Sequence, residues 1–223
     1  MNDGGQDDTG FWVKPAVLSA QECNVLLERL TAASVQRSRA GARHLMSEPA
    51  VWELAIDSRL RQIAAAGIGG TAVPFRATLF EKSGASNWLV VWHQDTALPL
   101  AARFESPEWG PWSEKAGVLY AHAPTWALAR VLALRVHLDD SHKRNGPLRV
   151  IPGSHRLGVL SDEQVFDLAH RETAVHCNAD RGSVLAMRPL LIHSSLKVES
   201  EDPRRVLHLE YADALEFIQT HWN

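Results

Sequence analysis

The pattern of hydrophobic positions changes from helical to strand-like about a third of the way along the chain. Ser19 and Glu22 form a capping-box pair, and apolar residues then recur at helical spacing (Cys23, Leu26, Leu27 and Leu30). This spacing predicts a helix that begins after Ser19. A second helix is expected over about residues 49–66, because the glycines at 67, 69 and 70 mark its end.

After residue 72 the chain consists of short apolar runs separated by turn-forming residues. These runs predict strands over 75–82, 88–92, 127–138, 148–151, 174–178, 182–188, 190–193 and 205–211. Asn145-Gly146 is a strong hairpin signal, and Ser161 with Gln164 predicts one further capped helix. Residues 103–123 are rich in Trp, Gly and Pro, and we expect them to form a long loop of the kind that covers a binding site.

Helices followed by many short strands favour a mainly β fold, a β-sandwich or jelly roll with N-terminal and flanking α-helices packed outside it. At 223 residues the chain is long enough for one domain with a full core. We expect a disordered tail over residues 1–10 and a single domain over 11–223. The helical part of this domain would cover about 19–70, and its β-roll core about 72–212.

Composition argues against several classes of partner. The formal net charge of −3 leaves no basic surface of the kind that binds nucleic acid. No apolar run is long enough to span a bilayer, and the polar first ten residues do not resemble a signal peptide. The two cysteines, Cys23 and Cys177, cannot form a disulfide framework and lack zinc-type spacing. We therefore expect a cytoplasmic protein; the oligomeric state is not predicted.

The most informative stretch is the end of the apolar run 88–92, which leads into His93-Gln94-Asp95. Residues two apart at a strand end point to the same side, so His93 and Asp95 can converge on one point. An imidazole and a carboxylate supply two of the three ligands of a facial metal site with open positions. Such a site is typical of non-haem Fe(II) used for oxygen chemistry.

Three other motifs have a histidine followed two residues later by a carboxylate: His137-Asp139, His170-Glu172 and His208-Glu210. The His170 motif lies on a predicted helix, where residues two apart diverge and cannot chelate one ion. The His208 motif lies near the end of the chain, with no basic residue after it. His137-Asp139 also ends an apolar strand, so it remains the serious alternative to His93-Asp95.

Three segments together resemble the phytanoyl-CoA dioxygenase family. They are His93-Gln94-Asp95, the run from Asn145 to His155 (NGPLRVIPGSH), and His193 followed by Arg204. The resemblance covers roughly residues 72–212. It implies a double-stranded β-helix, a cupin-like form of the jelly roll, and an oxygenase that depends on Fe(II) and 2-oxoglutarate.

The resemblance also implies roles for single residues. His93, Asp95 and His193 would bind iron, and Arg204 would bind the far carboxylate of 2-oxoglutarate with help from Ser195. A guanidinium pairs well with a carboxylate, and a hydroxyl can add a further hydrogen bond. The neighbours Arg205 and Ser194 compete for these two roles, although alternation points the two arginines in opposite directions.

Substrate residues are less well defined by the sequence. Arg135 stands where some relatives have an aromatic residue, and by alternation it shares a strand face with His137. If this face lines the cavity, Arg135 could bind the cosubstrate or an anionic substrate. Trp112 and Lys115, in the expected loop, are further candidate substrate contacts, as is His137.

The sequence thus predicts an Fe(II)/2-oxoglutarate-dependent dioxygenase that hydroxylates a small molecule, using O2 and releasing succinate and CO2. Arg135 and Lys115 point to an anionic substrate. Two alternatives remain open at this stage. One is a cupin-like metal enzyme that does not use 2-oxoglutarate and in which His137-Asp139 contributes ligands. The other is a non-catalytic relative that keeps the fold as a small-molecule binding module.

Overall fold

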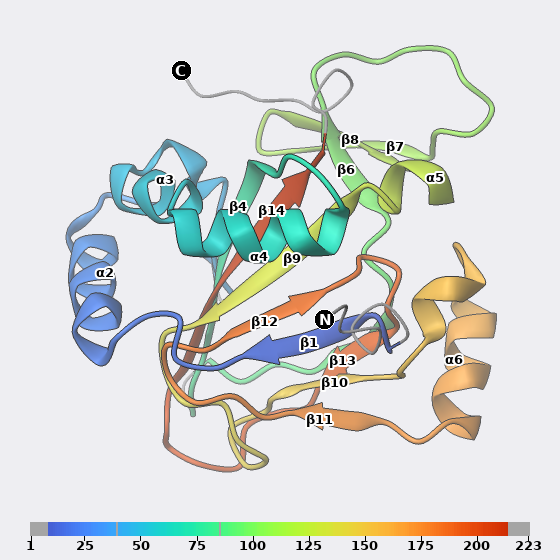
Figure 1. Ribbon diagram of the computed structural model, residues 1–223. Helices are drawn as coiled ribbons and strands as arrows, with labels where there is room; N and C mark the ends of the chain where they lie inside the picture. The colour runs from blue at the N-terminus through green and yellow to red at the C-terminus, as the bar shows by residue number, and fades with distance from the viewer. Residues whose placement is uncertain (1–8, 39, 85, 214–223) are drawn as a thin grey trace.

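A computed structural model describes residues 9–38, 40–84 and 86–213, and the strands within these ranges form three antiparallel sheets (Figure 1). The strand order is β1-β12-β9-β14-β4-β3-β2 in the large sheet, β11-β10-β13-β5 in the second and β6-β8-β7 in the small one. The strands are β1 (Phe11–Lys14), β2 (Arg37–Ser38), β3 (Gly41–Arg43), β4 (Val73–Lys82), β5 (Val90–His93), β6 (Ala97–Leu100), β7 (Trp112–Lys115), β8 (Val118–His122), β9 (Val131–His137), β10 (Leu148–Val150), β11 (Val175–Cys177), β12 (Val184–Met187), β13 (His193–Ser195) and β14 (Arg204–Ala212). The helices are α2 (Ala20–Ala32), α3 (Pro49–Ala55), α4 (Ser58–Ile68), α5 (Thr125–Leu128) and α6 (Asp162–Arg171), with 3-10 turns at Leu45–Ser47 and Ser154–Leu157.

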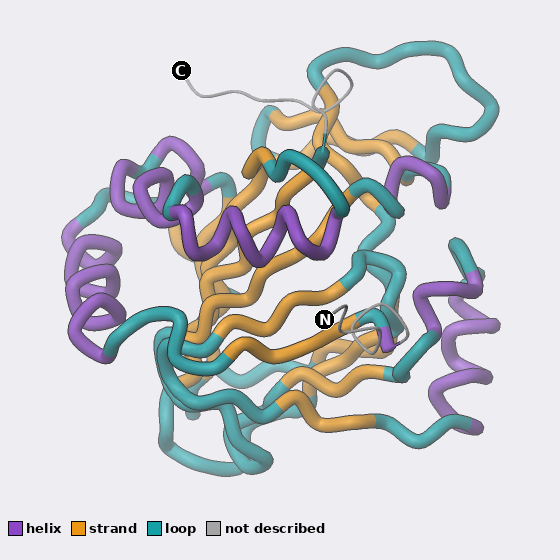
Figure 2. Tube along the Cα trace, in the orientation of Figure 1, coloured by secondary structure: helices purple, strands orange, loops and turns teal. Residues whose placement is uncertain are grey.

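The outer face of the large sheet is apolar because every second residue of its central strands is a large aliphatic side chain. Leu132, Leu134 and Val136 of β9 project from this face, and α2, α3 and α4 cover it (Figure 2). The phenol of Tyr211 on β14 donates a hydrogen bond of 2.9 Å to the carbonyl of Ala55, at the end of α3. These contacts form the larger hydrophobic core and hold the helices outside the roll.

The inner face of the same sheet meets the second sheet and differs in character along its length. Leu185 and Met187 of β12 pack against Leu148 and Val150 of β10, closing one part of the roll with apolar contacts. On β4, β9 and β14 the inward positions are largely polar or charged, including Lys82, Arg135, His137, Arg204, His208 and Glu210. The interior of the roll is therefore apolar between β12 and β10, and it is polar beside β4, β9 and β14.

The predicted jelly roll with helices outside it is confirmed, and so are most of its elements. Both predicted capping boxes are present, at the starts of α2 and α6. The helix expected over 49–66 is two helices, because the chain turns at residues 56–57. There the carboxylate of Asp57 accepts a hydrogen bond of 2.8 Å from the backbone N–H of Arg59 and caps α4.

The prediction of one irregular loop over residues 103–123 was wrong in its second half, since β7 and β8 form a hairpin there. The register pairs Trp112 with Ala121 and Lys115 with Val118. Alternation in such short strands was hidden by the Gly and Pro residues around them. This hairpin belongs to the small sheet, which lies beside the open end of the roll (Figure 1).

Asn145-Gly146 does not form a hairpin, because β9 and β10 on either side of it belong to different sheets. The Asn145 side chain instead closes a turn, accepting from the N–H of His142 (2.8 Å) and donating to the carbonyl of Asp140 (2.7 Å). Gly146 has φ +69, and a Cβ there would lie 2.6 Å from the carbonyl oxygen of Leu196. Glycine is therefore required by the crossing between sheets.

Residues 9 and 10, the last two of the tail expected over residues 1–10, are held by the rest of the fold. The carbonyls of Thr9 and Gly10 accept backbone hydrogen bonds of 2.9 Å from Gly153 and Arg188. Residues 1–8 lie outside the described part of the chain. Within that part, no helix has the length and apolar character needed to cross a bilayer.

The packing predicts that the same Leu→Ala truncation lowers the free energy of unfolding much more at a core position than at an exposed one. Leu134→Ala removes a fully buried side chain from the core beneath the helices, so the free energy of unfolding should fall by about 2–5 kcal/mol. Leu157→Ala makes the same change at a side chain that is 54% exposed and should cost less than about 0.5 kcal/mol. Urea unfolding followed by circular dichroism measures both; equal losses would contradict the assigned core.

Candidate active site

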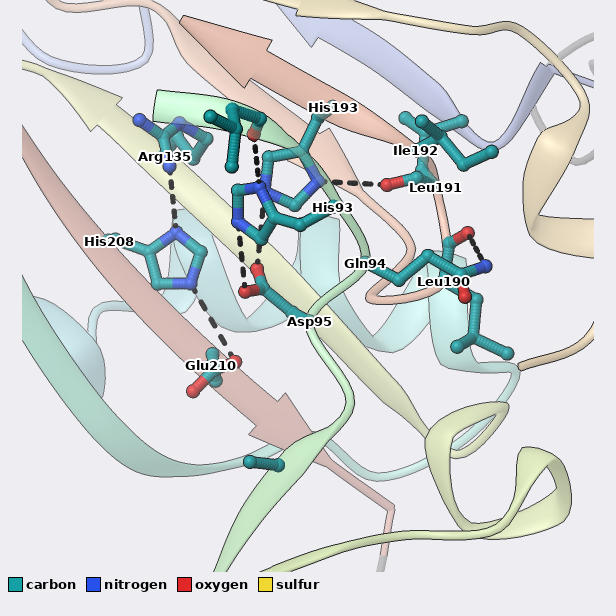
Figure 3. Close-up of polar contacts among 12 residues, drawn as sticks. His93, Gln94, Asp95, Arg135, Leu190, Leu191, Ile192, His193, His208 and Glu210 are labelled. Carbon is teal, nitrogen blue, oxygen red and sulfur yellow. Dashed lines mark hydrogen bonds and ion pairs between the residues drawn. The ribbon is translucent and has the colours of Figure 1, made fainter. Parts of the chain in front are cut away.

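His93, Asp95 and His193 come together because β5 and β13 are neighbouring antiparallel strands whose register places His93 opposite His193. The two imidazole rings lie 4.2 Å apart between centroids. The carboxylate of Asp95 lies 3.7 Å from Nε2 of His93 and 3.5 Å from Nε2 of His193 (Figure 3). The ligand atoms of all three lie within 4.8 Å of one another, so a single metal ion can contact all three.

Backbone hydrogen bonds orient both imidazoles. Nδ1 of His93 lies 2.8 Å from the carbonyl of Val91, and Nδ1 of His193 lies 2.8 Å from the carbonyl of Leu191 (Figure 3). A carbonyl can only accept, so each Nδ1 must carry the proton. In the neutral ring this leaves the Nε2 lone pair free and aimed at Asp95.

The charges of the three groups suit a divalent cation. Burial acts to raise the pKa of Asp95, but the neighbouring rings of His193 and His93 outweigh it and hold this pKa well below its usual range. Burial lowers the pKa of His193 to about 4, against the opposing effect of Asp95. At neutral pH the site therefore offers a carboxylate and a neutral His193 imidazole.

The structure separates this motif from its competitors. Asp139 accepts two hydrogen bonds of 2.7 Å from the Arg205 guanidinium, so it is already paired. Glu210 forms a buried ion pair with Arg76, and His170 lies on α6 against Phe166. Among the described residues, His93, Asp95 and His193 are the one group of three that could hold a metal ion.

The group lies in a cavity of about 450 Å³, whose inner end is strongly basic. Lys82 and Arg204 face each other across β4 and β14, and Arg135 projects from β9. Nζ of Lys82 donates to Oγ of Ser195 (2.7 Å) and to the carbonyl of Leu196 (2.7 Å). Arg204 donates to the carbonyl of Asn145 (3.2 Å) and reaches Oγ of Ser195 at 3.5 Å.

These three cations are buried, and within the described residues none has a carboxylate partner. Burial, aided by the charges of neighbouring cations, lowers the pKa of Lys82 to about 7 and that of Arg204 to about 9. Burial also lowers the pKa of Arg135 to about 10, although Asp95 opposes it. Buried charge without a counterion is costly, and this end of the cavity is therefore suited to an anionic ligand.

Strand alternation decides which of the neighbouring candidates, Arg204 or Arg205 and Ser195 or Ser194, faces the cavity. Arg204 points inward, whereas Arg205 points outward to Asp139. Ser195 faces the cavity and donates from Oγ to the carbonyl of Gly146 (2.8 Å), whereas the Ser194 hydroxyl accepts from Arg149 (3.0 Å).

The remaining predicted residues are only partly brought together. Arg135 lines the cavity, with a guanidinium nitrogen 3.2 Å from Nδ1 of His208 (Figure 3). Lys115 lines the cavity at its mouth. Trp112 is not a lining residue and packs against Phe104 at 5.4 Å between ring centroids. His137 is also outside the lining; it is 1% exposed, and neither ring nitrogen has a hydrogen-bond partner among the residues that the structure describes.

Sequence analysis missed several lining residues. The inward positions of β4 carry Arg76, Thr78 and Phe80, and alternation could have identified them once the inner face was known. His208 was set aside as a ligand, yet it also lines the cavity. A further set, Arg43, His44, Tyr120 and His122, comes from segments that meet only through tertiary pairing, and no local pattern marks them.

Gln94, which lies between His93 and Asp95 in the sequence, has a structural role. Its side-chain nitrogen donates to the carbonyls of Leu190 (2.8 Å) and Gly158 (2.9 Å), and its oxygen accepts from the N–H of Leu160 (2.9 Å). Both N–H donors and one acceptor position of this amide are used, and it fixes the turn that carries Asp95.

The protein resembles known oxygenases in sequence and in fold. The ectoine dioxygenase of Sphingopyxis alaskensis is 27% identical over 185 residues, which are 73% of this chain and 54% of that protein. The chain thus spans about half the length of this curated relative.

Solved structures show the same fold. The structure of EctD from S. alaskensis with 2-oxoglutarate and 5-hydroxyectoine matches with a TM-score of 0.74 at 23% identity, covering 98% of this chain and 80% of that one. AviO1 from Streptomyces viridochromogenes Tue57 matches with a TM-score of 0.67 at 23% identity, over 96% and 94% of the two chains. HygX from Streptomyces hygroscopicus, with nickel and 2-oxoglutarate bound, matches with a TM-score of 0.67 at 18% identity, over 92% and 84%.

The family model described as phytanoyl-CoA dioxygenase (PhyH) matches residues 7–206. This match includes His93, Asp95 and His193, together with the basic residues at the inner end of the cavity. The chain belongs to the phytanoyl-CoA dioxygenase family.

Proposed function

We propose that this protein is a non-haem Fe(II)/2-oxoglutarate-dependent dioxygenase that hydroxylates a small molecule. The observation that carries the proposal is that one cavity holds both a three-ligand group and an uncompensated basic pocket. A metal site alone would fit many enzymes. The basic pocket beside it supplies the site for an acidic cosubstrate, as expected for an oxygenase of this class. Relatives whose structures contain 2-oxoglutarate support the same conclusion.

His93, Asp95 and His193 would hold the iron. Two imidazole nitrogens and one carboxylate oxygen on one side of the ion are the donor set of Fe(II) oxygenases, and they leave the remaining positions open. When bound, iron would couple decarboxylation of 2-oxoglutarate to oxidation of the substrate, one atom of O2 entering succinate and the other the product. The backbone hydrogen bonds to both Nδ1 atoms keep the ligand nitrogens aimed at the site before any metal arrives.

Lys82, Arg204 and Ser195 would bind the far carboxylate of 2-oxoglutarate. The guanidinium offers paired donors, and the ammonium adds charge and a third donor. Ser195 already bridges Lys82 and the carbonyl of Gly146, so it holds the ammonium in place. Arg135 lies nearer His208 and would contribute positive charge to the cosubstrate without a direct pair.

Both alternative functions are less well supported. A cupin-like enzyme that uses His137-Asp139 would need Asp139 to leave the Arg205 ion pair. A binding module would have no use for two imidazoles held with their Nε2 atoms aimed at a carboxylate.

We also propose that residues 11–223 act as one catalytic domain and that the enzyme is cytoplasmic. Its free cysteines, Cys23 and Cys177, are both buried, consistent with a reducing compartment.

The first test concerns the metal. His193→Ala should abolish stoichiometric binding of Co(II), added anaerobically as a spectroscopic substitute for Fe(II), because only two ligands remain. The metal content after gel filtration measures the loss. His170→Ala, on the exposed side of α6, is the matched control and should bind one equivalent. Full metal retention in His193→Ala, with unchanged thermal unfolding, would contradict the assignment.

The second test concerns the cosubstrate. Arg204→Gln removes a buried cation from its presumed carboxylate pair, which costs about 2 kcal/mol or more, so the Kd for 2-oxoglutarate should rise about 30-fold or more. Isothermal titration calorimetry of the Ni(II)-loaded protein measures the change. Arg205→Gln removes the outward neighbour and should leave this Kd within about twofold. Similar losses in both variants would argue against Arg204 as the anchor.

The third test uses the pKa of Lys82. Since this pKa is about 7 in the unliganded pocket, a bound dianion should raise it, because the anion stabilises the ammonium. At pH 8 the binding of 2-oxoglutarate should therefore be accompanied by uptake of a proton, and affinity should fall as pH rises further. Calorimetry in buffers of different ionisation enthalpy measures the uptake. Lys82→Met should abolish it; uptake that persists in this variant would assign the proton to another group.

A further inference from the structure

The mouth of the cavity is a second basic region, separate from the inner pocket. Along β4 the inward residues run from Lys82 at the inner end to Arg76 near the mouth, about 20 Å away at the rise of a strand. On β14, Arg204 pairs with Lys82 and Glu210 pairs with Arg76 in the register. The cavity therefore has an inner end at Lys82 and Arg204 and a mouth at Arg76 and Glu210. His93, Asp95 and His193 line the same cavity.

The deep charges at the mouth are compensated. Arg76 forms its buried ion pair with Glu210 and donates to the carbonyl of Ala97 at 3.1 Å. Glu210 also lies 3.7 Å from Nε2 of His208 (Figure 3). This arrangement contrasts with the inner end, where the cations have no carboxylate. The Arg76–Glu210 pair thus forms a nearly neutral polar floor.

The rim above this floor carries two uncompensated cations. Arg43 ends β3 opposite Thr78, and Lys115 ends β7 with its ammonium 5.7 Å from the centre of the Tyr120 ring. Both side chains are exposed and line the cavity. Neither has an ion pair or a hydrogen bond with any other residue that the structure describes. They approach the mouth from different sheets, Arg43 from the large sheet and Lys115 from the small one.

The rest of the mouth is aromatic and polar. Tyr120 is buried, and the imidazole of His122 is held by the Thr96 hydroxyl at 2.7 Å. His44 lies near Tyr120, with ring centroids 6.3 Å apart. These walls suit a compact organic body, and the positive rim suits a negative group attached to it. The whole protein has net charge −3, so this local excess of positive charge is not a general property of its surface.

We propose that the substrate carries an oxyanion, a carboxylate or a phosphate, which Arg43 and Lys115 bind at the mouth while the organic body extends toward His93, Asp95 and His193. Oxidation of that body depends on the proposed function; the anion subsite itself does not. Charge-assisted contacts from two separate sheets would fix the orientation of the substrate and hence the carbon presented to the metal site.

Matched small molecules test the subsite. Benzoate, phenyl phosphate and neutral benzamide are titrated by calorimetry into Zn(II)-loaded protein saturated with 2-oxoglutarate, so that the inner pocket is filled. The double variant Arg43→Gln/Lys115→Gln should weaken binding of the tighter anion about tenfold or more. The control Arg103→Gln/Lys14→Gln removes two exposed cations that do not line the cavity and should change binding less than twofold.

The outcomes separate the two proposals. Tighter binding of benzoate or of phenyl phosphate assigns the group as carboxylate or phosphate, and either supports the subsite. Binding of benzamide equal to that of the anions, equal losses in both double variants, or no anion binding at millimolar concentration would overturn it. The affinity for 2-oxoglutarate is measured on the same samples. If the protein fails to bind 2-oxoglutarate yet loses anion binding in the Arg43/Lys115 variant, the proposed function fails and the anion subsite stands.

Discussion

The pairing of two short strands, β5 and β13, is the constraint on which the site depends. Their register sets His93 opposite His193, and the turn after β5 brings Asp95 between the two imidazoles. The same backbone supplies the carbonyls that fix both Nδ1 atoms. A slip of one residue in this pairing would turn one histidine to the other face of the sheet. The side chain of Gln94, bonded to three backbone groups, resists such a slip by holding the chain just before Asp95.

The second organising feature is the distribution of buried charge. Acidic side chains compensate Arg76 and Arg205, but Lys82, Arg135 and Arg204 are buried without an acidic partner in the described part of the chain. The fold offsets part of this cost because Lys82 and Arg204 donate hydrogen bonds to the Ser195 hydroxyl and to backbone carbonyls, although these neutral acceptors do not cancel the charge. A dianionic cosubstrate would offset part of this charge, so its binding would stabilise the buried cations.

The sequence was sufficient for the parts of the molecule that follow local rules. Alternation on β9 correctly placed Arg135 and His137 on one face, opposite Leu134 and Val136, and the structure shows that this face points inward. The H-x-D motif at a strand end identified His93 and Asp95, and resemblance to the family added His193 and Arg204; the structure brings all of these to one cavity. Their chemical roles remain proposals.

The sequence could not show that Trp112 packs away from the cavity while Lys115, three residues later, lines it, because that depends on a hairpin without a clear periodic pattern. The turn at 56–57 and the cluster of Arg43, Tyr120 and His122 were similarly hidden, since they depend on contacts between distant segments.

The most direct test of the account is a crystal structure obtained anaerobically with Fe(II) and 2-oxoglutarate. We predict one metal ion within about 2.1 Å of Nε2 of both histidines and of a carboxylate oxygen of Asp95. The far carboxylate of the cosubstrate should lie on Arg204 and Lys82. An ion bound elsewhere, or a cosubstrate whose far carboxylate rests on Arg43 and Lys115, would contradict the central claim.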